Sequence, residues 1–169
     1  MIRQWIRLCR PKHWVKNLFV LAPLAFALAF FSAGPILRAL AACAAFCLAS
    51  SAVYVVNDLA DREQDRLHPT KKHRPLASGA VPARQALALA AVLLAAGAAL
   101  ALALGPLPPA IILAYFALNV AYSLALKNRM FIDVMVIAAG FLLRVAAGAA
   151  AIAVPLSQWM LLTTFFISL

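Results

Sequence analysis

Long apolar runs alternate with short polar connections along the chain, and these runs predict membrane-spanning helices. A helix needs roughly 20 mainly apolar residues to cross the hydrocarbon core of a bilayer. The apolar runs lie at residues 18–32, 36–56, 85–104, 108–126, 131–153 and from 156 onward. The connections between them on one side, at 32–35, 105–109 and 154–158, are short and contain Gly or Pro, which favours turns. The pattern predicts an all-α polytopic transmembrane helical bundle.

The last apolar run is still open at Leu169. We therefore expect residues 1–169 to form the amino-terminal part of a longer, single membrane-embedded domain. This part would hold about five complete helices and the start of a sixth, because each run is roughly one span long.

Composition supports the membrane assignment, since 66% of the 169 residues are hydrophobic and only 12% are charged. The formal net charge of +10 does not point to nucleic acid, because the basic residues follow the topology. All Lys and Arg residues except Arg38 and Arg144 fall on one side if the spans alternate. The positive-inside rule places that side, with the amino terminus, in the cytoplasm of a cell (inner) membrane. A cleaved secretory signal is a weaker interpretation of the first run, because further spans follow it directly.

Four of the five acidic residues fall in the stretch NDLADREQD at 57–65. On a helix that continues past the second run, Asp61 lies about 60° and Asp65 about 20° from Asp58, so the three share one face. Glu63 falls on the other side, as a solvated surface charge. Three like charges so close repel one another, which predicts a cation among them.

Hard oxygen ligands without nearby His or Cys suit Mg²⁺, and the Asn57 amide adds a further oxygen. We therefore expect Asp58, Asp61 and Asp65 to be catalytic metal ligands. The alternative is a solvated loop in which Arg62, Arg66 and the following lysines pair with the acids.

A basic stretch, Lys71, Lys72, His73 and Arg74, follows the acids within ten residues of Asp65. Carboxylates that hold Mg²⁺ and cations that contact phosphate oxygens together suit a phosphate-rich substrate. Lys71, Lys72 and Arg74 are thus candidate substrate-binding residues.

Polar residues on the later runs add further candidates. Asp133 and Arg144 share a face about 16 Å apart along the fifth run. An arginine that deep usually lies inside the bundle, where we favour substrate contact over a structural role. Tyr122 and Lys127 fit phosphate contact and interfacial anchoring equally well.

The amino-terminal stretch RQWIRLCRPKHWVKN mixes tryptophans and aliphatic residues with basic residues, which predicts an interfacial helix on an anionic leaflet. His13, Lys16 and Asn17 lie where this stretch turns into the membrane, within reach of a lipid phosphate.

Several of these stretches resemble a known family. NDLADREQD matches the Asn-Asp-x-x-Asp-x-x-x-Asp motif of the UbiA superfamily of intramembrane prenyltransferases, and HRPLASG at 73–79 matches the segment that follows it. RPKHWVKN at 10–17, AYSLALK at 121–127 and GFLLRVAAG at 140–148 resemble the decaprenyl-phosphate phosphoribosyltransferase branch. The resemblance covers nearly the whole chain.

This resemblance implies a nine-helix bundle with a cytoplasm-facing cavity. The family's second acidic motif, expected after the sixth helix, lies outside this sequence. The branch implies Mg²⁺-dependent transfer of 5-phosphoribose from phosphoribosyl pyrophosphate to a polyprenyl (decaprenyl) phosphate in cell envelope biosynthesis. The metal would be held by Asp58, Asp61 and Asp65. The phosphates would be contacted by residues among Lys71, Lys72, Arg74, Tyr122 and Lys127.

Two other functions stay open at this point. A prenyltransferase of the same superfamily would move a prenyl chain from its diphosphate to 4-hydroxybenzoate or to a quinone or haem precursor, with fewer cationic contacts. A non-enzymatic membrane protein such as a transporter would place its polar residues nearer the middle of the membrane. The expected partners are the bilayer, the two substrates and, as an open alternative, a second copy in a homo-oligomer.

Overall fold

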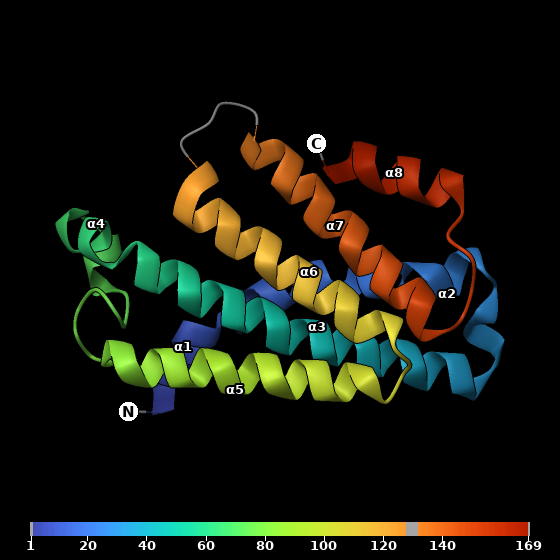
Figure 1. Ribbon diagram of the computed structural model, residues 1–169, viewed down its shortest axis with the longest axis horizontal. Helices are drawn as coiled ribbons and strands as arrows, with labels where there is room; N and C mark the ends of the chain where they lie inside the picture. The colour runs from blue at the N-terminus through green and yellow to red at the C-terminus, as the bar shows by residue number, and fades with distance from the viewer. Residues whose placement is uncertain (1, 128–131, 169) are drawn as a thin grey trace.

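One long helix, α3 (Ala33–Ala60), runs through the middle of the molecule and contacts most of the other elements. The computed structural model describes residues 2–127 and 132–168, and these residues form helices and turns without a strand. Helix α5 (Ala83–Leu102) packs along one side of α3, and α6 (Leu107–Ala121) and α7 (Ile132–Ala151) pack along the other (Figure 1). The expected all-α bundle is confirmed.

Within the described residues, four helices are long and apolar enough to cross a membrane: Ala33–Ala60, Ala83–Leu102, Leu107–Leu126 and Ile132–Ala151. They confirm the spans expected at 36–56, 85–104, 108–126 and 131–153 to within a few residues, and the protein is an integral membrane protein. The run from 156 onward contains α8 (Gln158–Ser168). Arg129, residue 131 and Leu169 lie outside the described residues.

The expected continuous helix over 18–32 was wrong. The chain there forms a 3₁₀ helix, η1 (Pro11–Leu21), then a short α2 (Ala22–Phe26) and a second 3₁₀ turn, η2 (Ala29–Phe31). Leu28, between the last two pieces, has a left-handed backbone with φ of 49°. The segment is held against α3 and α7, so packing replaces regular α-helical geometry.

A single glycine lets η1 approach α7 closely. A Cβ atom at Gly148 would lie 1.9 Å from the carbonyl oxygen of Val20, and Val20 itself is fully buried. Small residues at helix contacts allow backbones to come close together within a membrane. Alanines such as Ala45 and Ala49 do the same where α3 meets its neighbours.

The amino-terminal helix α1 (Ile2–Cys9) lies beside α3, with Leu8 fully buried in a cluster formed with residues of α3, α5 and the loop before α5. Its Ile2 and Ile6 side chains are exposed. One face of α1 is therefore anchored in the protein, and another offers apolar side chains to the surroundings, as an interfacial helix does.

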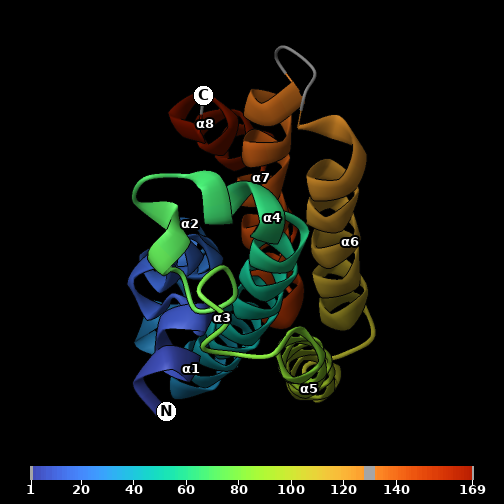
Figure 2. The ribbon, with the colours of Figure 1, turned by 90° about the vertical axis from the view of Figure 1, so that its left-hand side faces the viewer.

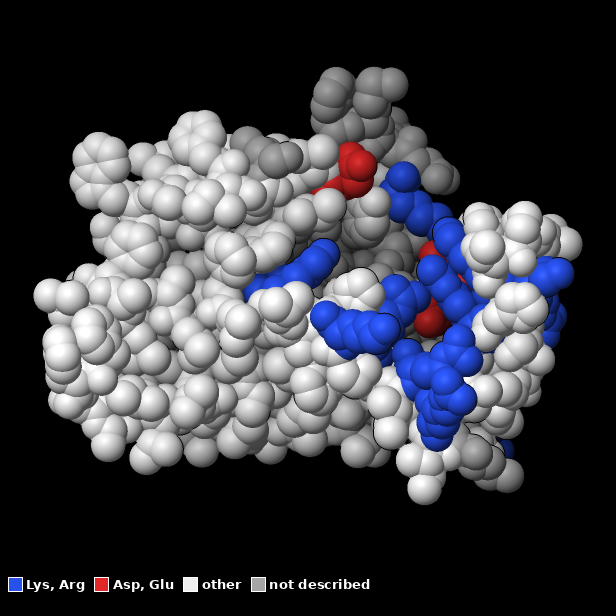
Figure 3. Space-filling view, turned by 180° about the vertical axis from the view of Figure 1, so that it is seen from behind, with Lys and Arg blue, Asp and Glu red and all other residues white. Residues whose placement is uncertain are grey.

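Charged side chains gather at one end of the bundle. Figure 3 shows Lys and Arg side chains around a hollow at this end, with acidic side chains among them. Helices α1 and α4 (Arg62–Leu67) also lie here (Figure 2).

Near the start of α3, Arg38 donates to the carbonyl oxygens of Ala151 (2.6 Å) and Leu104 (2.5 Å). It thereby caps the carboxyl ends of two helices with positive charge.

The contact at Gly148 predicts a packing defect. Gly148→Ala should lower the free energy of unfolding by about 1–3 kcal/mol, because the added methyl group meets a backbone carbonyl that cannot rotate away. Thermal unfolding in detergent micelles, followed by tryptophan fluorescence, measures the effect. Gly34→Ala is the matched control, since nothing lies within 4 Å of a Cβ atom at that position. Equal unfolding temperatures for the two variants would contradict the packing described.

Candidate functional site

The acidic stretch lies where α3 gives way to α4. Asp61 separates the two helices, with φ of −88° and ψ of 1°. The Asp61 amide still donates to the Asn57 carbonyl (3.0 Å), and the Asp65 amide donates to the Asp61 carbonyl (2.8 Å). The helical path therefore continues through the break, and the three aspartates lie on successive turns.

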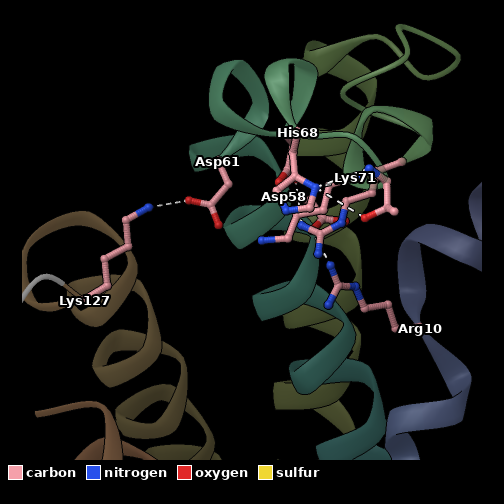
Figure 4. A network of polar contacts seen from close by, with 9 residues as sticks. Arg10, Asp58, Asp61, His68, Lys71 and Lys127 are labelled. Atoms are coloured by element: carbon pink, nitrogen blue, oxygen red, sulfur yellow. Dashed lines mark hydrogen bonds and ion pairs between the residues drawn. The ribbon is translucent and has the colours of Figure 1, made fainter. Parts of the chain in front are cut away.

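Asp58 and Asp65 are joined by one arginine. Arg74 Nη1 lies 2.7 Å from Asp65 Oδ2 and 3.2 Å from Asp58 Oδ1. Asp58 Oδ1 also accepts a hydrogen bond from Arg10 Nη2 at 2.5 Å (Figure 4). Both aspartates are only 3% exposed, so each charge lies in a setting where a lost partner would be costly.

The loop after α4 positions Arg74. Leu76, two residues later, is fully buried against α3 and α5. The Ser78 amide donates to the Arg74 carbonyl (2.9 Å), and the Val81 amide donates to the Pro75 carbonyl (3.1 Å). The segment HRPLASG thus forms a compact turn that holds the guanidinium over the two carboxylates.

Asp61 turns away from the other two aspartates. Its Oδ1 lies 2.5 Å from Lys127 Nζ, which comes from the end of a π-helical turn, η4 (Tyr122–Leu126), that continues α6 (Figure 4). Ser123 of the same turn donates to Asn57 Oδ1 at 2.5 Å. π-Helical turns often occur at functional sites, and here the turn directs a lysine and a serine at the end of α3.

Each of the three aspartates therefore binds a basic side chain. These basic side chains are not Arg62, Arg66 or the following lysines, which would pair with the aspartates in a solvated loop. Arg66 pairs instead with Glu63 on the surface, where the Glu63 side chain is 74% exposed. Within residues 2–127 and 132–168, no group of three or more His, Cys, Asp or Glu side chains lies close enough to hold a metal ion. In this arrangement the carboxylates bind basic side chains and are not gathered around one point.

A cavity of about 190 Å³ opens beside Asn57, between α3, α6, η4 and α7. Its polar lining comes from Lys16, Tyr54, Asn57, Tyr115, Asn119, Tyr122, Asp133 and Arg144. Five residues singled out from the sequence (Lys16, Asn57, Tyr122, Asp133 and Arg144) thus line one cavity, next to the acidic end of α3.

Arg144 is bound by neutral groups inside the bundle. Its guanidinium donates to Asn17 Oδ1 (2.9 Å), the Gly140 carbonyl (2.8 Å) and the Tyr115 hydroxyl (2.9 Å). Its Cζ also lies 4.7 Å from the centroid of the Tyr115 ring. Among the described hydrogen bonds and ion pairs, none joins Arg144 to Asp133, although both line the cavity.

Asn17 differs from its expected place near a lipid phosphate. Its side chain is fully buried, and its Nδ2 donates to Ser50 Oγ at 3.0 Å. Its oxygen accepts from Arg144. The reason is that η1 folds into the bundle before the chain reaches the next span, which takes Asn17 away from the surface.

Lys71 and Lys72 lie on η3 (Lys71–His73) and are exposed, with no contact to the aspartates among the described ion pairs. They stay predicted phosphate ligands. Arg10 and Ser123, which contact Asp58 and Asn57 respectively, were not predicted from the sequence as site residues. Only the position of Arg10 at the start of RPKHWVKN and of Ser123 within AYSLALK offered a signal for them.

The sequence of the chain is similar to that of known proteins. Residues 18–169 match the model of the UbiA prenyltransferase family. The chain is 40% identical to a decaprenyl-phosphate phosphoribosyltransferase of Mycolicibacterium smegmatis, over 97% of this chain and 53% of that protein. It is 42% identical to the enzyme of the same name from Corynebacterium glutamicum, over 97% of this chain and 51% of that protein. The chain spans about half the length of these curated relatives.

The fold has a solved counterpart. A UbiA homologue from Archaeoglobus fulgidus, bound to GPP and Mg²⁺, superposes with a TM-score of 0.79 at 24% identity, over 98% of this chain and 59% of that one. At 24% sequence identity, this structural similarity establishes the fold of the chain alone.

The position of Asn17 gives a stability prediction. Asn17→Ala should lower the free energy of unfolding by about 1.5–3 kcal/mol, because the buried Arg144 guanidinium loses an acceptor. Asn119→Ala is the matched control, since the one hydrogen bond of the Asn119 amide group to the described residues goes to the Tyr115 carbonyl of its own helix (2.8 Å). Thermal unfolding of both variants in the same detergent measures the difference. A loss at Asn17 no greater than that at Asn119 would show that Arg144 does not depend on this contact.

Proposed function

The chain belongs to the UbiA prenyltransferase family, and from this premise we propose that it transfers 5-phosphoribose from phosphoribosyl pyrophosphate to a polyprenyl phosphate. The products are polyprenylphosphoryl-5-phosphoribose and pyrophosphate. Likeness to the phosphoribosyltransferases over nearly the whole chain supports this branch over aromatic prenyl transfer. The observation that carries the proposal is the matched set of three aspartates and three basic side chains beside a polar cavity.

Magnesium fits the donor groups of this set. Asp58, Asp61 and Asp65 offer hard carboxylate oxygens, which Mg²⁺ prefers, and the solved relative contains the ion. These aspartates would hold the metal after giving up their present cationic partners. When bound, Mg²⁺ neutralises charge on a pyrophosphate group and so favours its departure.

The basic partners released from the aspartates have a role of their own. Arg10, Arg74 and Lys127 are already positioned at the acidic end of α3, within 3.2 Å of a carboxylate oxygen. They would turn to phosphate oxygens of the donor or acceptor, for which Arg offers two parallel hydrogen bonds. The more exposed Lys71 and Lys72 would contact phosphate from the loop side.

The bond changes need little proton transfer. An oxygen of the lipid phosphate forms a bond to carbon 1 of the ribose as the bond from that carbon to pyrophosphate breaks. The attacking oxygen is already anionic at neutral pH, so the protein has no strong base to supply. Its contribution is to hold two highly charged substrates together and to stabilise the charge that moves. Tyr122, Asp133 and Arg144 line the cavity in which the ribose would lie.

The setting proposed is the cytoplasmic face of the cell membrane. The basic end of the molecule (Figure 3) is the end that the positive-inside rule assigns to the cytoplasm. Phosphoribosyl pyrophosphate is water-soluble and would enter from there, and the polyprenyl phosphate would come from the bilayer.

The carboxylates provide the first test of the chemistry. Asp58→Asn or Asp61→Asn should reduce phosphoribosyl transfer by at least about 100-fold, because each removes a metal ligand. Glu63→Gln is the matched control, since Glu63 is exposed and contacts only Arg66 among the described ion pairs. Transfer is measured as radiolabel moving into the lipid fraction. Unchanged transfer by both aspartate variants, or by the wild-type protein after exhaustive chelation of divalent cations, would contradict the proposal.

The substrate pair provides a second test. Membranes containing the protein should convert labelled phosphoribosyl pyrophosphate and polyprenyl phosphate into a labelled lipid. Replacing the acceptor with unphosphorylated polyprenol should give no product, because the nucleophile is then missing. Product formed only from a prenyl diphosphate and an aromatic acid would instead show an aromatic prenyltransferase.

A further inference from the structure

A basic groove lies beside the amino-terminal helix, apart from the cavity described above. Its volume is about 630 Å³, within the usual range for ligand pockets. It is lined by Arg3, Ile6, Arg7, Arg10, Pro11, Lys12 and His13. No acidic residue lines it, and among the described ion pairs only Arg10 of these residues has a carboxylate partner.

The backbone builds this groove at a strained turn. Arg3 and Arg7 lie one turn apart on α1, and Arg10 adopts a left-handed conformation with φ of 50° and ψ of 57°. This conformation is uncommon outside glycine and costs free energy. It turns the chain so that residues 11–13 close the groove opposite α1, with the His13 amide donating to the Arg10 carbonyl (2.9 Å). Topology alone explains basic residues on this side of the membrane, but not their convergence on one concavity.

An apolar groove of about 360 Å³ adjoins the basic one. It is lined by Trp5, Ile6, Cys9, Pro11, Trp14, Leu48, Ser51, Leu89 and Leu93. Two of its polar side chains are already paired, since Trp14 Nε1 donates to Ser51 Oγ (3.0 Å) and Ser51 Oγ donates to the Cys9 carbonyl (2.9 Å). Ile6 and Pro11 belong to both grooves, so a cationic surface passes directly into an apolar one.

We propose that the two grooves together form the acceptor site, with the phosphate of a polyprenyl phosphate in the basic groove and its first isoprene units in the apolar groove. This inference rests on the proposed function and assigns its acceptor substrate to a site on the protein. A phosphate monoester carries a charge between about −1.5 and −2 at neutral pH, which suits a groove of arginines without acids. Arginine also binds phosphate through two parallel hydrogen bonds.

The groove is connected to the candidate active site through two side chains. Arg10 lines the groove and also binds Asp58 at 2.5 Å. Tyr54 lines the central cavity, and it lies under both Arg10 (5.1 Å from Cζ to the ring centroid) and His13 (5.2 Å between ring centroids). A lipid phosphate between Arg7 and Arg10 would therefore lie one side chain away from the metal-binding aspartates.

His13 supports the same assignment. Partial burial, together with the nearby charges of Arg10 and Lys16, lowers the pKa of His13. At neutral pH it is therefore uncharged, and it offers a hydrogen bond while the arginines supply the charge.

The test measures lipid binding without any donor substrate. The protein in phosphatidylcholine nanodiscs is titrated with polyprenyl phosphate, and the fluorescence of Trp5 and Trp14 in the apolar groove reports binding. We expect saturable quenching that weakens about tenfold in Arg7→Gln, because one charge-assisted phosphate contact is lost. Arg7→Lys keeps the charge and should keep most of the affinity. Arg84→Gln removes an exposed charge outside the groove and should bind as the wild type does.

Separate arms distinguish the possible ligands. Phosphatidylglycerol and inorganic phosphate, each in the same concentration range, should compete at least tenfold less well than polyprenyl phosphate, because neither fills both grooves. Equal competition by phosphatidylglycerol would show a general surface for anionic lipids and overturn the proposal. Wild-type affinity of the Arg7→Gln variant for polyprenyl phosphate would also overturn the proposal. If the wild-type protein binds polyprenyl phosphate but does not transfer phosphoribose to it, the proposed reaction is overturned and the acceptor site stays in place.

Discussion

A carboxylate removed from water needs a cation, and this requirement ties together the charged end of the molecule. Asp58 near the end of α3 and Asp65 on α4 are almost fully buried, so an unpaired charge at either position would cost several kcal/mol. Their partners come from the amino-terminal segment (Arg10) and the loop before α5 (Arg74), and Lys127, directly after η4, neutralises the neighbouring Asp61. Three segments distant in sequence therefore meet at this end of the molecule, and each supplies one positive charge.

Such pairs contribute little net stability, since the cost of desolvating both charges offsets much of their attraction. In the proposed reaction, the role of these pairs is to change partners. A metal–pyrophosphate complex would bring positive charge for the carboxylates and negative charge for the arginines and the lysine, so the same side chains would change partners without leaving a charge uncompensated. The polar cavity is lined by Asn57, next to Asp58, and the basic groove is lined by Arg10, which binds Asp58; we propose the first for the sugar and the second for the lipid phosphate.

Most of the fold and part of the candidate site were predicted from the sequence. The predictions that were wrong or incomplete have physical causes. Four helices followed from uninterrupted apolar runs, but the run at 18–32 gave a broken segment because hydropathy does not report backbone geometry. There, the contact of Val20 with Gly148 and the bond from Asn17 to Arg144 hold the chain in 3₁₀ turns. The acidic motif correctly predicted that the candidate site lies at the carboxyl end of α3. Its partners did not follow from spacing, because Arg10 and Lys127 are 48 and 66 residues away from the aspartates they bind.

We propose that these aspartates exchange basic side chains for a metal ion and its pyrophosphate. The most direct measurement is an experimental structure of the protein with Mg²⁺ and phosphoribosyl pyrophosphate bound. We expect metal density between the carboxylates of Asp58, Asp61 and Asp65, with Arg74 and Lys127 turned to phosphate oxygens. A donor bound elsewhere, with all three aspartates still held by their present arginine and lysine partners, would contradict it.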